Sequence, residues 1–420
     1  YKEFKIVTTN LNQLANAVRF LSIDAVQKAN SGHPGMPMGM ADVATVLFKE
    51  HLRFNPQNPS WVNRDRFILS AGHGSMLLYS LLYLTGYKDF TMDELKNFRQ
   101  MKSICAGHPE YKKNSGIETT TGPLGQGLGN AVGLAIGEEI YRKKFSSSVV
   151  DHKTYAIASD GDLMEGISHE AMSLAGHLKL KNLIVFFDNN KISIDGPTSL
   201  SISDDYKKRF ESYGWNYLEV NGHNHKQISH AIKKASKSKK PNIISCKTVI
   251  GFGSPNKSGK SSSHGSPLGD EEISLVRKKL KWPHASFEMP ENILKNWRKI
   301  GEKGIALEKK WLSGLDKKNS KLKKELDLIQ NNSNLETLDS LINAEKEKYF
   351  KEKPSKATRE CSSITIEAVT KLLPEIIGGS ADLSGSNNTK TKNSKVISSK
   401  NFDGNYIHYG IREHGMAAAM

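Results

Sequence analysis

The fold is decided by the central segment, residues 155–190, which reads YAIASDGDLMEGISHEAMSLAGHLKLKNLIVFFDNN. Two short apolar runs, 155–159 and 183–187, flank a helix-like stretch at 164–178. Apolar runs of this length predict buried strands. Strands that alternate with helices form a parallel sheet with helices on its faces, and ligands bind at the carboxyl ends of such strands. We therefore expect an α/β fold with a ligand site where these two runs end.

The same alternation extends on both sides of this segment. Towards the N-terminus we expect helices at 14–29 and 40–52 and a short apolar run at 66–70. On the other side, residues 242–249 predict a third buried strand. Residues 290–355 are rich in Lys and Glu and poor in apolar side chains, which indicates a helical linker.

A second α/β pattern begins near residue 356. It consists of a helix at 362–373 and short strands at 375–377 and 406–409. At 420 residues the chain is long enough for about two to three domains. We expect three parts: a ligand-binding α/β domain at 1–290, the linker at 291–355, and the beginning of a second α/β domain at 356–420.

The composition is that of a globular protein and excludes several classes. The hydrophobic fraction is 37%, and no apolar run reaches the roughly 18 residues of a membrane helix. Cys105, Cys246 and Cys361 form no CxxC pair, which argues against a disulfide framework or a zinc site. The start, Tyr1, is not preceded by Met, and we interpret it as a trimmed or engineered end rather than a secretion signal. These features favour a cytoplasmic protein.

The formal net charge is +16, which would suit nucleic acid, an anionic membrane or acidic substrates. The lysines are scattered, and the densest stretches, 233–240 and 317–324, contain little aromatic interleaving. We therefore favour a solvated Lys-rich surface over nucleic-acid or membrane binding. The positive field would still attract phosphorylated substrates.

Asp160 and Asn190 each follow one of the two central strands. A carboxylate and an amide oxygen at neighbouring strand ends suit Mg²⁺ or Ca²⁺ shared with a diphosphate. Gly161 would allow close backbone approach to a phosphate, and the following helix N-terminus favours an anion. The alternative is that Asp-Gly and Asn-Asn are ordinary turn dipeptides.

Four histidines, His33, His73, His108 and His264, each lie on a Gly-rich turn. Imidazole can hydrogen-bond a phosphate or transfer a proton near neutral pH. A loop histidine is otherwise most often a surface residue. Two further patterns imitate sites: His223-x-His225 has the spacing of a metal pair, and the glycines at 125, 127 and 129 lack the strand and spacing of a dinucleotide fingerprint.

Several longer stretches carry a resemblance to a known family. Ser159-Asp160-Gly161 with Asn189-Asn190 is similar to the thiamine-diphosphate signature, with Ser159 where Gly is usual. The more specific stretches are SGHPG at 31–35, GHGS at 72–75, GHPE at 107–110, TTTGPLGQG at 119–127, LMEGIS at 163–168, IGFGS at 250–254 with His264-Gly265, GSADL at 379–383 and GIREHG at 410–415. Together, and in this order, they resemble transketolase over essentially the whole chain.

The resemblance implies the cofactor thiamine diphosphate with Mg²⁺, which Ca²⁺ or Mn²⁺ can replace. The implied metal ligands are Asp160, Asn190 and the carbonyl of Ile192. The implied cofactor-binding residues are His73, Gly122, Pro123, Leu124, Gly161, Glu165, Asn190, Ile194, His264 and Asp382. Glu165 and Glu170 further match a carboxylate network that links the two active sites of a homodimer in this family.

The resemblance also implies the catalytic residues Glu413, His33, His108 and His264. In thiamine enzymes a buried Glu at the position of Glu413 hydrogen-bonds the pyrimidine ring and stabilises its imino tautomer, and we expect burial to raise the pKa of this carboxyl. Since the cofactor lies between subunits in this family, Glu413 should serve the partner subunit. The implied substrate-binding residues are His33, His108, His264, Arg359 and Ser386, of which Arg359 suits a phosphate.

The implied activity is reversible transfer of a two-carbon ketol group through a thiamine-diphosphate carbanion, from a ketose phosphate such as xylulose 5-phosphate to an aldose phosphate such as ribose 5-phosphate, in the pentose phosphate pathway. Ser384-Gly385 departs from the usual Ala-Pro or Thr-Pro, and Met420 falls inside an expected helix. We therefore expect a truncated chain that is inactive by itself. The alternatives are dihydroxyacetone synthase, deoxyxylulose-phosphate synthase, which the paired histidines His33 and His108 disfavour, a non-catalytic cofactor-binding module, and a basic nucleic-acid binder.

Overall fold

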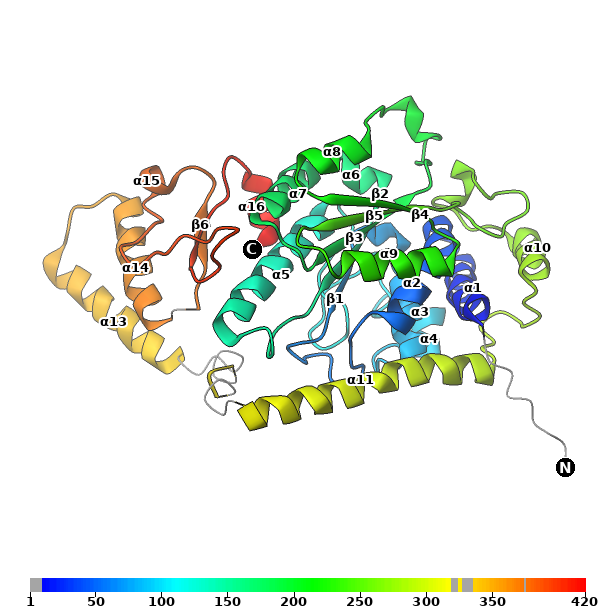
Figure 1. Ribbon diagram of the computed structural model, residues 1–420, viewed down its shortest axis with the longest axis horizontal. Helices are drawn as coiled ribbons and strands as arrows, with labels where there is room; N and C mark the ends of the chain where they lie inside the picture. Colours follow the sequence, from blue (N-terminus) through cyan, green and yellow to red (C-terminus); the bar gives the residue numbers. More distant parts are fainter. Residues whose placement is uncertain (1–9, 319–323, 327–334, 374) are drawn as a thin grey trace. The chain divides into compact units, whose positions relative to one another are not determined.

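The computed structural model describes residues 10–318, 324–326, 335–373 and 375–420 (Figure 1). These residues form two compact units. The first contains the described residues up to 135, residues 152–308 and residue 419. The second contains residues 136–151, the described residues of 309–418, and residue 420. The division passes through helices α5 (Gln126–Phe145) and α11 (Glu291–Lys318).

The first unit is built on a five-stranded parallel sheet with the strand order β1-β2-β3-β5-β4 (Figure 1). The strands are β1 (Arg66–Leu69), β2 (Thr154–Ser159), β3 (Leu183–Asn189), β4 (Asn216–Asn221) and β5 (Asn242–Lys247). Nearly every residue of β2, β3 and β5 is buried, as is usual for strands covered on both faces. The expected α/β fold is confirmed.

Register brings the two central strands to a common edge. Ser159 pairs with Asp188, so the residues that follow β2 and those that end β3 lie at the same carboxyl edge of the sheet. The capping box of Ser159 and Asp162 then starts the short helix α6 directly at the strand end. This abrupt turn is what places Asp160 at the edge.

Helices cover both faces of the sheet. Three of them, α1 (Leu11–Ala29), α2 (Gly35–Glu50) and α3 (Ser75–Thr85), pack against one another and are almost wholly buried along their lengths. The others of this unit are α4 (Met92–Lys96), α6 (Asp160–Met164), α7 (Gly166–Leu178), α8 (Tyr206–Ser212), α9 (His225–Ala235) and α10 (Asp270–Leu280), with 3-10 turns η1 (Gly72–Gly74), η2 (Thr198–Leu200) and η3 (Ser261–Ser263).

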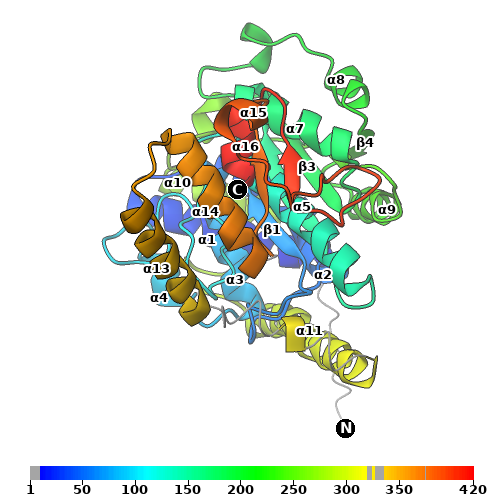
Figure 2. The same cartoon turned by 90° about the vertical axis from the view of Figure 1, so that its left-hand side faces the viewer.

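The second unit contains helices α13 (Leu335–Glu352) and α14 (Thr358–Leu372), which lie side by side in Figures 1 and 2. Its two-stranded parallel sheet pairs β6 (Gly378–Ser380) with β7 (Tyr406–His408). The short helices α15 (Ser384–Asn387) and α16 (Glu413–Ala419) follow β6 and β7 respectively. No helix among the described residues combines the length and apolar character needed to cross a membrane.

Some elements differ from the sequence predictions. The strand predicted at 375–377 is wrong: Ile376 lies in a turn after α14, and the strand begins at Gly378. A Cβ at Gly379 would lie 2.5 Å from the Tyr409 ring, so the sheet uses the glycines for close approach rather than the apolar run. Strand β4 was not predicted because it is a half-buried edge strand. The helix predicted at 164–178 is interrupted by the extended backbone of Glu165.

The prediction of a helical region at 290–355 holds for α11 and α13, and its middle part lies outside the described residues. The two domain boundaries expected from the sequence, at 290/291 and 355/356, stay predictions.

Candidate active site

A cavity of about 330 Å³ opens in the first unit at the carboxyl edge of the sheet. One wall is formed by residues 159–161, where β2 passes into α6, and another by residues at the end of β3 and in the loop after it, namely Asp188, Asn190 and 192–195. The remaining walls come from four separate segments that contribute His33, His73, Gly122 with Leu124, and His264. This is the position that the strand pattern predicted for a ligand.

Asp160 is buried in this cavity without adequate partners. Its Oδ2 atom has no hydrogen-bond partner among the described residues, and its Oδ1 accepts a long bond of 3.5 Å from the Tyr206 hydroxyl. Burial, followed by the charge on Asp188, raises the pKa of Asp160 to about 7. The Lys191 backbone also acts on this carboxyl and opposes the rise of its pKa. An unpaired buried carboxyl is costly unless a cation or proton satisfies it. The site therefore has the electrostatic character of an acceptor for a cation.

Asn190 is oriented by its neighbours. Its Nδ2 donates to Asp188 Oδ2 at 2.9 Å, and its Oδ1 accepts from the backbone nitrogen of Ile192 at 2.9 Å. Burial raises the pKa of Asp188 to about 6, although hydrogen bonds from Thr248 and Asn190 oppose the rise. The sequence did not single out Asp188 as a site residue, although its place at the end of β3 was the available signal.

The donor set is one of oxygen atoms. The described residues contain no group of three or more His, Cys, Asp or Glu side chains placed to hold a metal. A cation beside Asp160 would therefore depend on amide or carbonyl oxygens, which the loop at 190–192 provides in the same cavity. Hard oxygen donors of this kind fit Mg²⁺, Ca²⁺ or Mn²⁺ rather than Zn²⁺.

The four predicted histidines come together although they are far apart in sequence. The ring of His33 lies 5.2 Å from that of His73, 5.6 Å from that of His264 and 6.3 Å from that of His108. The rings of His73 and His264 stack at 5.1 Å. Three of the four line the cavity, and His108, which is exposed, lies beside it.

The surroundings lower the pKa of all four histidines and so favour their uncharged form. Burial lowers the pKa of His33 to about 4, with further contributions from His264, Arg99 and His108. Burial also lowers the pKa of His73 and His264, and that of the exposed His108 falls through partial burial and the charge of Arg99. Neutral rings keep one nitrogen as donor and one as acceptor. They can therefore hydrogen-bond phosphate or hydroxyl groups without adding a positive charge that would repel a cation.

One glycine sets the approach of the His264 loop to α2. The backbone nitrogen of Gly251 donates to the carbonyl of Gly35 at 3.0 Å. A Cβ at Gly35 would overlap the carbonyl oxygen of Ser263 and lie 2.6 Å from Ile250 Cγ1. Only glycine at the first residue of α2 permits this contact.

Asp162, which the sequence analysis did not identify, is buried behind the cavity lining and accepts several hydrogen bonds. Its Oδ1 accepts from Ser70 Oγ at 2.6 Å and from the Gly125 nitrogen at 2.9 Å. Its Oδ2 accepts from both the nitrogen and the hydroxyl of Ser159 at 2.8 Å. The carboxylate thereby fixes β1, the loop at 122–127 and β2 relative to one another.

Of the other predicted residues in the first unit, Ile194 lines the cavity, whereas Glu165 and Pro123 do not. In the first unit, Glu165 is exposed between α6 and α7, and Pro123 lies between the lining residues Gly122 and Leu124. Ile194 does line the cavity and is 70% exposed. The hydrophobic lining residues Met36 and Ile250 were not predicted, because apolar residues carry no chemical signal in a sequence.

Four predicted residues belong to the second unit, and each is exposed there. Arg359 lies in α14, Ser386 in α15, and Asp382 has a left-handed backbone with φ 65° just after β6. Glu413 is the first residue of α16. The burial expected for Glu413 is not provided by its own chain.

His223 and His225 form a second histidine group with a different environment. His223 Nδ1 and His225 Nε2 both bond the carboxylate of Asp42, at 2.9 and 2.8 Å, and Arg19 forms an ion pair with the same group. His223 Nε2 also accepts from the Val249 nitrogen at 3.1 Å. The His-x-His spacing serves a buried hydrogen-bond network rather than a metal.

Comparison with known proteins places this fold and site in the class of thiamine-diphosphate-binding proteins. The family described as "Transketolase, thiamine diphosphate binding domain" matches residues 10–336, and "Transketolase, pyrimidine binding domain" matches residues 354–420. The chain belongs to the transketolase family. The resemblance seen in the sequence is thus confirmed.

The relatives agree over nearly the whole chain. A transketolase of Rhodobacter capsulatus is 52% identical over 408 residues, which cover 97% of this chain and 61% of that protein. Transketolase 1 of Pasteurella multocida is 52% identical over 421 residues, with 97% and 62% covered. The chain therefore spans about three fifths of the length of these relatives.

Solved structures give the same correspondence. Transketolase from Campylobacter jejuni superposes with a TM-score of 0.86 at 42% identity, covering 97% of this chain and 62% of that one. A Pichia stipitis transketolase in complex with sedoheptulose 7-phosphate superposes with a TM-score of 0.85 at 38% identity, covering 98% and 62%. The residues that line the cavity, from His33 to His264, lie within the range matched by the thiamine diphosphate binding domain.

Proposed function

We propose that this chain provides the diphosphate-binding part of a transketolase, which transfers a two-carbon ketol group between sugar phosphates. The observation that carries the proposal is the cavity in which the unpaired Asp160 carboxylate faces the same space as three neutral histidines. That combination offers a cation site for a diphosphate beside hydrogen-bonding groups for a polyhydroxylated substrate. Family membership supports the same interpretation.

Asp160, Asn190 and the carbonyl of Ile192 would hold Mg²⁺, for which Ca²⁺ or Mn²⁺ can substitute. The cation would offset the charge that makes the buried Asp160 and Asp188 costly in the metal-free chain. Thiamine diphosphate, when bound, supplies a carbon nucleophile and accommodates the negative charge that develops when a ketose phosphate is cleaved.

The chain's own groups bind and orient the reactants. His73 and His264 would donate hydrogen bonds to the diphosphate, together with the backbone at Gly161 and the N-terminus of α6. Gly122, Pro123, Leu124, Glu165 and Ile194 would position the remainder of the cofactor. His33, His108 and His264 would bind the sugar hydroxyls, and their neutral rings can accept or return a proton there.

The second unit would supply Asp382 and Glu413 to the cofactor and Arg359 and Ser386 to the sugar phosphate. Solved Pichia stipitis transketolases contain xylulose 5-phosphate and sedoheptulose 7-phosphate, which supports sugar phosphates as the substrate class here. We further propose a homodimer. Glu413 is exposed in its own chain, and Ile194 and Ile411 are 70% and 77% exposed, so apolar surface and a catalytic carboxylate are both available to a second subunit.

Cofactor binding and ketol transfer test this function separately. Calorimetry with thiamine diphosphate and Mg²⁺ should show binding that Asp160→Asn weakens by more than the roughly 10–100-fold typical of losing an outer-shell partner. Asp93→Asn, an exposed acid on α4, should bind as the parent does. Transfer from xylulose 5-phosphate to ribose 5-phosphate is then measured on this chain and on a chain extended to the length of its relatives. An extended chain with neither binding nor transfer would overturn the proposal.

A further inference from the structure

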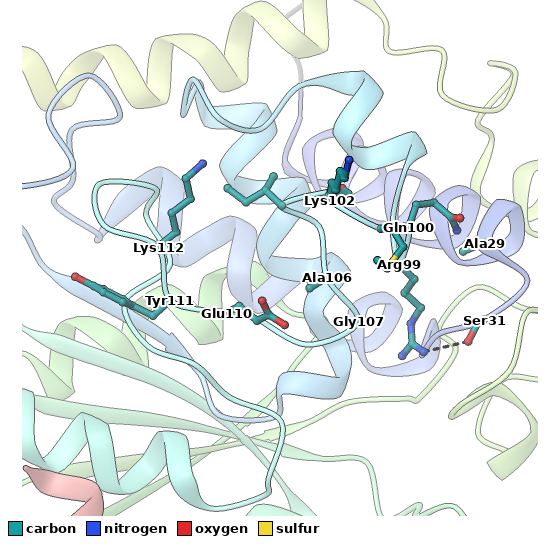
Figure 3. A pocket seen from close by; sticks show the side chains of 13 residues that line it. Ala29, Ser31, Arg99, Gln100, Lys102, Ala106, Gly107, Glu110, Tyr111 and Lys112 are labelled. Atoms are coloured by element: carbon teal, nitrogen blue, oxygen red, sulfur yellow. Dashed lines mark hydrogen bonds between the residues drawn. The ribbon is translucent and has the colours of Figure 1, made fainter.

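We propose that Arg99 is a positioning residue that joins the loop carrying His33 to the loop carrying His108. The role of those histidines toward a sugar rests on the function proposed above, but the joining of the loops does not. Arg99 belongs to neither loop and lies in the turn after α4, at the wall of an open hollow of about 860 Å³ (Figure 3).

The first link is a hydrogen bond to the His33 loop. Arg99 Nη1 donates to Ser31 Oγ at 3.0 Å, and Figure 3 shows the guanidinium reaching toward Ser31. Ser31 stands two residues before His33, directly after the C-cap of α1, where its backbone nitrogen donates to the Val26 carbonyl at 3.3 Å. The neighbouring Phe98 supports the same loop: a Cβ at Gly32 would lie 2.9 Å from the Phe98 ring.

The second link is a close contact with the His108 loop. A Cβ at Gly107 would lie 3.2 Å from Arg99 Cζ and 3.3 Å from Arg99 Nε, so the guanidinium rests directly against the Gly107 backbone. The Arg99 nitrogen also donates to the Cys105 carbonyl at 2.9 Å. One side chain therefore contacts both loops, on either side of the gap between the histidines.

The backbone explains how this arrangement is reached. Arg99 has a φ of 63°, in the left-handed region that few residues other than glycine adopt. The side chains of Phe98 and Arg99, which are consecutive, both reach the loop that carries His33, and Arg99 also reaches the loop that carries His108. The loop after Cys105 is anchored independently, because Tyr79 donates to the Ala106 carbonyl at 3.0 Å and Ser75 to the Gly107 carbonyl at 2.9 Å. Arg99 thus adds the connection between two loops rather than the folding of one.

The position also places a fixed positive charge beside both histidines. The charged or titratable groups that act on His33 are His264, Arg99 and His108, with His73 in ring contact. Arg99 is the charged group that acts on His108, and Glu110 lies two residues further along the same loop. Arg99 is the permanent cation of this set, so it supports the neutral form of both rings.

The test uses substitutions that separate the positive charge of Arg99 from the contacts of its guanidinium group. Arg99→Gln removes both the charge and the contacts, whereas Arg99→Lys keeps the charge and loses the planar group that contacts Ser31 and Gly107. Histidine signals titrated by NMR on the cofactor-free chain should show a raised pKa for His33 and His108 in Arg99→Gln and little change in Arg99→Lys. The control is Arg298→Gln, since the Arg298 guanidinium also lies against a glycine, Gly86, but is not among the charges acting on His33 or His108.

A double-mutant cycle tests the loop connection. In the extended, cofactor-loaded enzyme, Arg99→Gln should lower kcat/KM for the ketose phosphate by about 10–100-fold, because small displacements of positioned groups are costly. Adding Ser31→Ala to Arg99→Gln should cost nothing further, whereas Ser31→Ala alone should reproduce part of the loss. Thiamine diphosphate affinity should be unchanged in all three.

Unaltered titration of His33 and His108 in a folded Arg99→Gln chain, or additive effects of the Arg99 and Ser31 substitutions, would overturn the proposal. Failure of the unsubstituted chain to bind thiamine diphosphate would instead count against the proposed function. The two failures are distinguishable because the NMR titration requires neither cofactor nor substrate.

Discussion

Asp42 and Asp160 are both buried aspartates of the first unit, each 3–4% exposed, yet their surroundings are opposite. Asp42 is bonded to Arg19, His223 and His225, and these partners outweigh its burial and hold its pKa well below the usual range. Asp160 has one oxygen without a partner among the described residues, and its pKa is raised to about 7. A buried carboxylate with a full set of partners, such as Asp42, stabilises the fold. A buried carboxylate that lacks partners, such as Asp160, indicates a ligand-binding site.

The histidines follow the same division. His223 and His225 stand close in sequence and have partners for the nitrogens that face the protein. His33, His73, His108 and His264 come from four separate segments, and His33 Nδ1 is buried without a partner in the described part of the chain. Proximity in sequence, which suggested a metal pair, was the poorer guide to function.

The largest effect on stability is expected from a substitution at Asp42, whose carboxylate is fully paired. Asp42→Asn leaves the buried Arg19 without its counter-charge, so we expect the free energy of unfolding to fall by about 3–5 kcal/mol. Denaturant unfolding of the cofactor-free chain measures it, with Asp93→Asn as the control. A loss below about 1 kcal/mol would show that Arg19 is satisfied by its bonds to Met38 and Asn16 alone.

The same substitution at Asp160, whose carboxylate lacks partners, should change the free energy of unfolding in the opposite direction. Asp160→Asn removes a buried charge that lacks partners, so the metal-free chain should become more stable by about 1–3 kcal/mol. The same denaturant experiment without divalent cations measures it. Destabilisation by Asp160→Asn would mean that the carboxylate is already satisfied, and the contrast with Asp42 would disappear.

The pH dependence sharpens this second comparison. Because the folded pKa of Asp160 lies above its unfolded value near 3.9, the folded state binds more protons between about pH 4 and pH 7. The penalty of the charged group is therefore present above pH 7 and disappears as the pH falls toward 4. The stability gained by Asp160→Asn should shrink over the same window. A constant difference from pH 8 to pH 4 would contradict the raised pKa.

The smallest expected effect concerns His33. Its folded pKa of about 4 lies below the unfolded value near 6.5, so the unfolded state binds more protons between these two values. Stability is then lost as the pH falls from 6.5 to 4. In His33→Gln this part of the loss should be absent, and unfolding curves at pH 7 and pH 5 compare the two chains. Equal losses in both chains would show that His33 titrates normally.

The sequence was sufficient for the features that depend on local pattern. Buried parallel strands are continuous apolar runs, and β2 and β3 were predicted within two residues of their bounds. The positions of Asp160 and Asn190 at one edge follow from parallel strands alone. The half-exposed edge strand β4 has no such pattern, and it was missed.

Contacts between distant segments could not be predicted in this way. Asp162 resembles a turn residue in the sequence, and only the fold brings Ser70 and Gly125 to it. The resemblance to transketolase predicted that the four histidines belong to one site, whereas their spacing in the sequence could not predict this. Arg99 carried no signal at all, since a single arginine after a short helix is ordinarily a surface residue.

Residue 35 has a consequence beyond its own turn. Because Gly35, the first residue of α2, has no side chain, the segment that leads to His264 can pack directly against the start of this helix. The distance between the His33 and His264 side chains therefore depends on the absence of a Cβ at residue 35. Gly35→Ala would force the backbone at Ser263 away from α2, because the added Cβ would overlap the Ser263 carbonyl oxygen, and it would thereby displace His264 relative to His33.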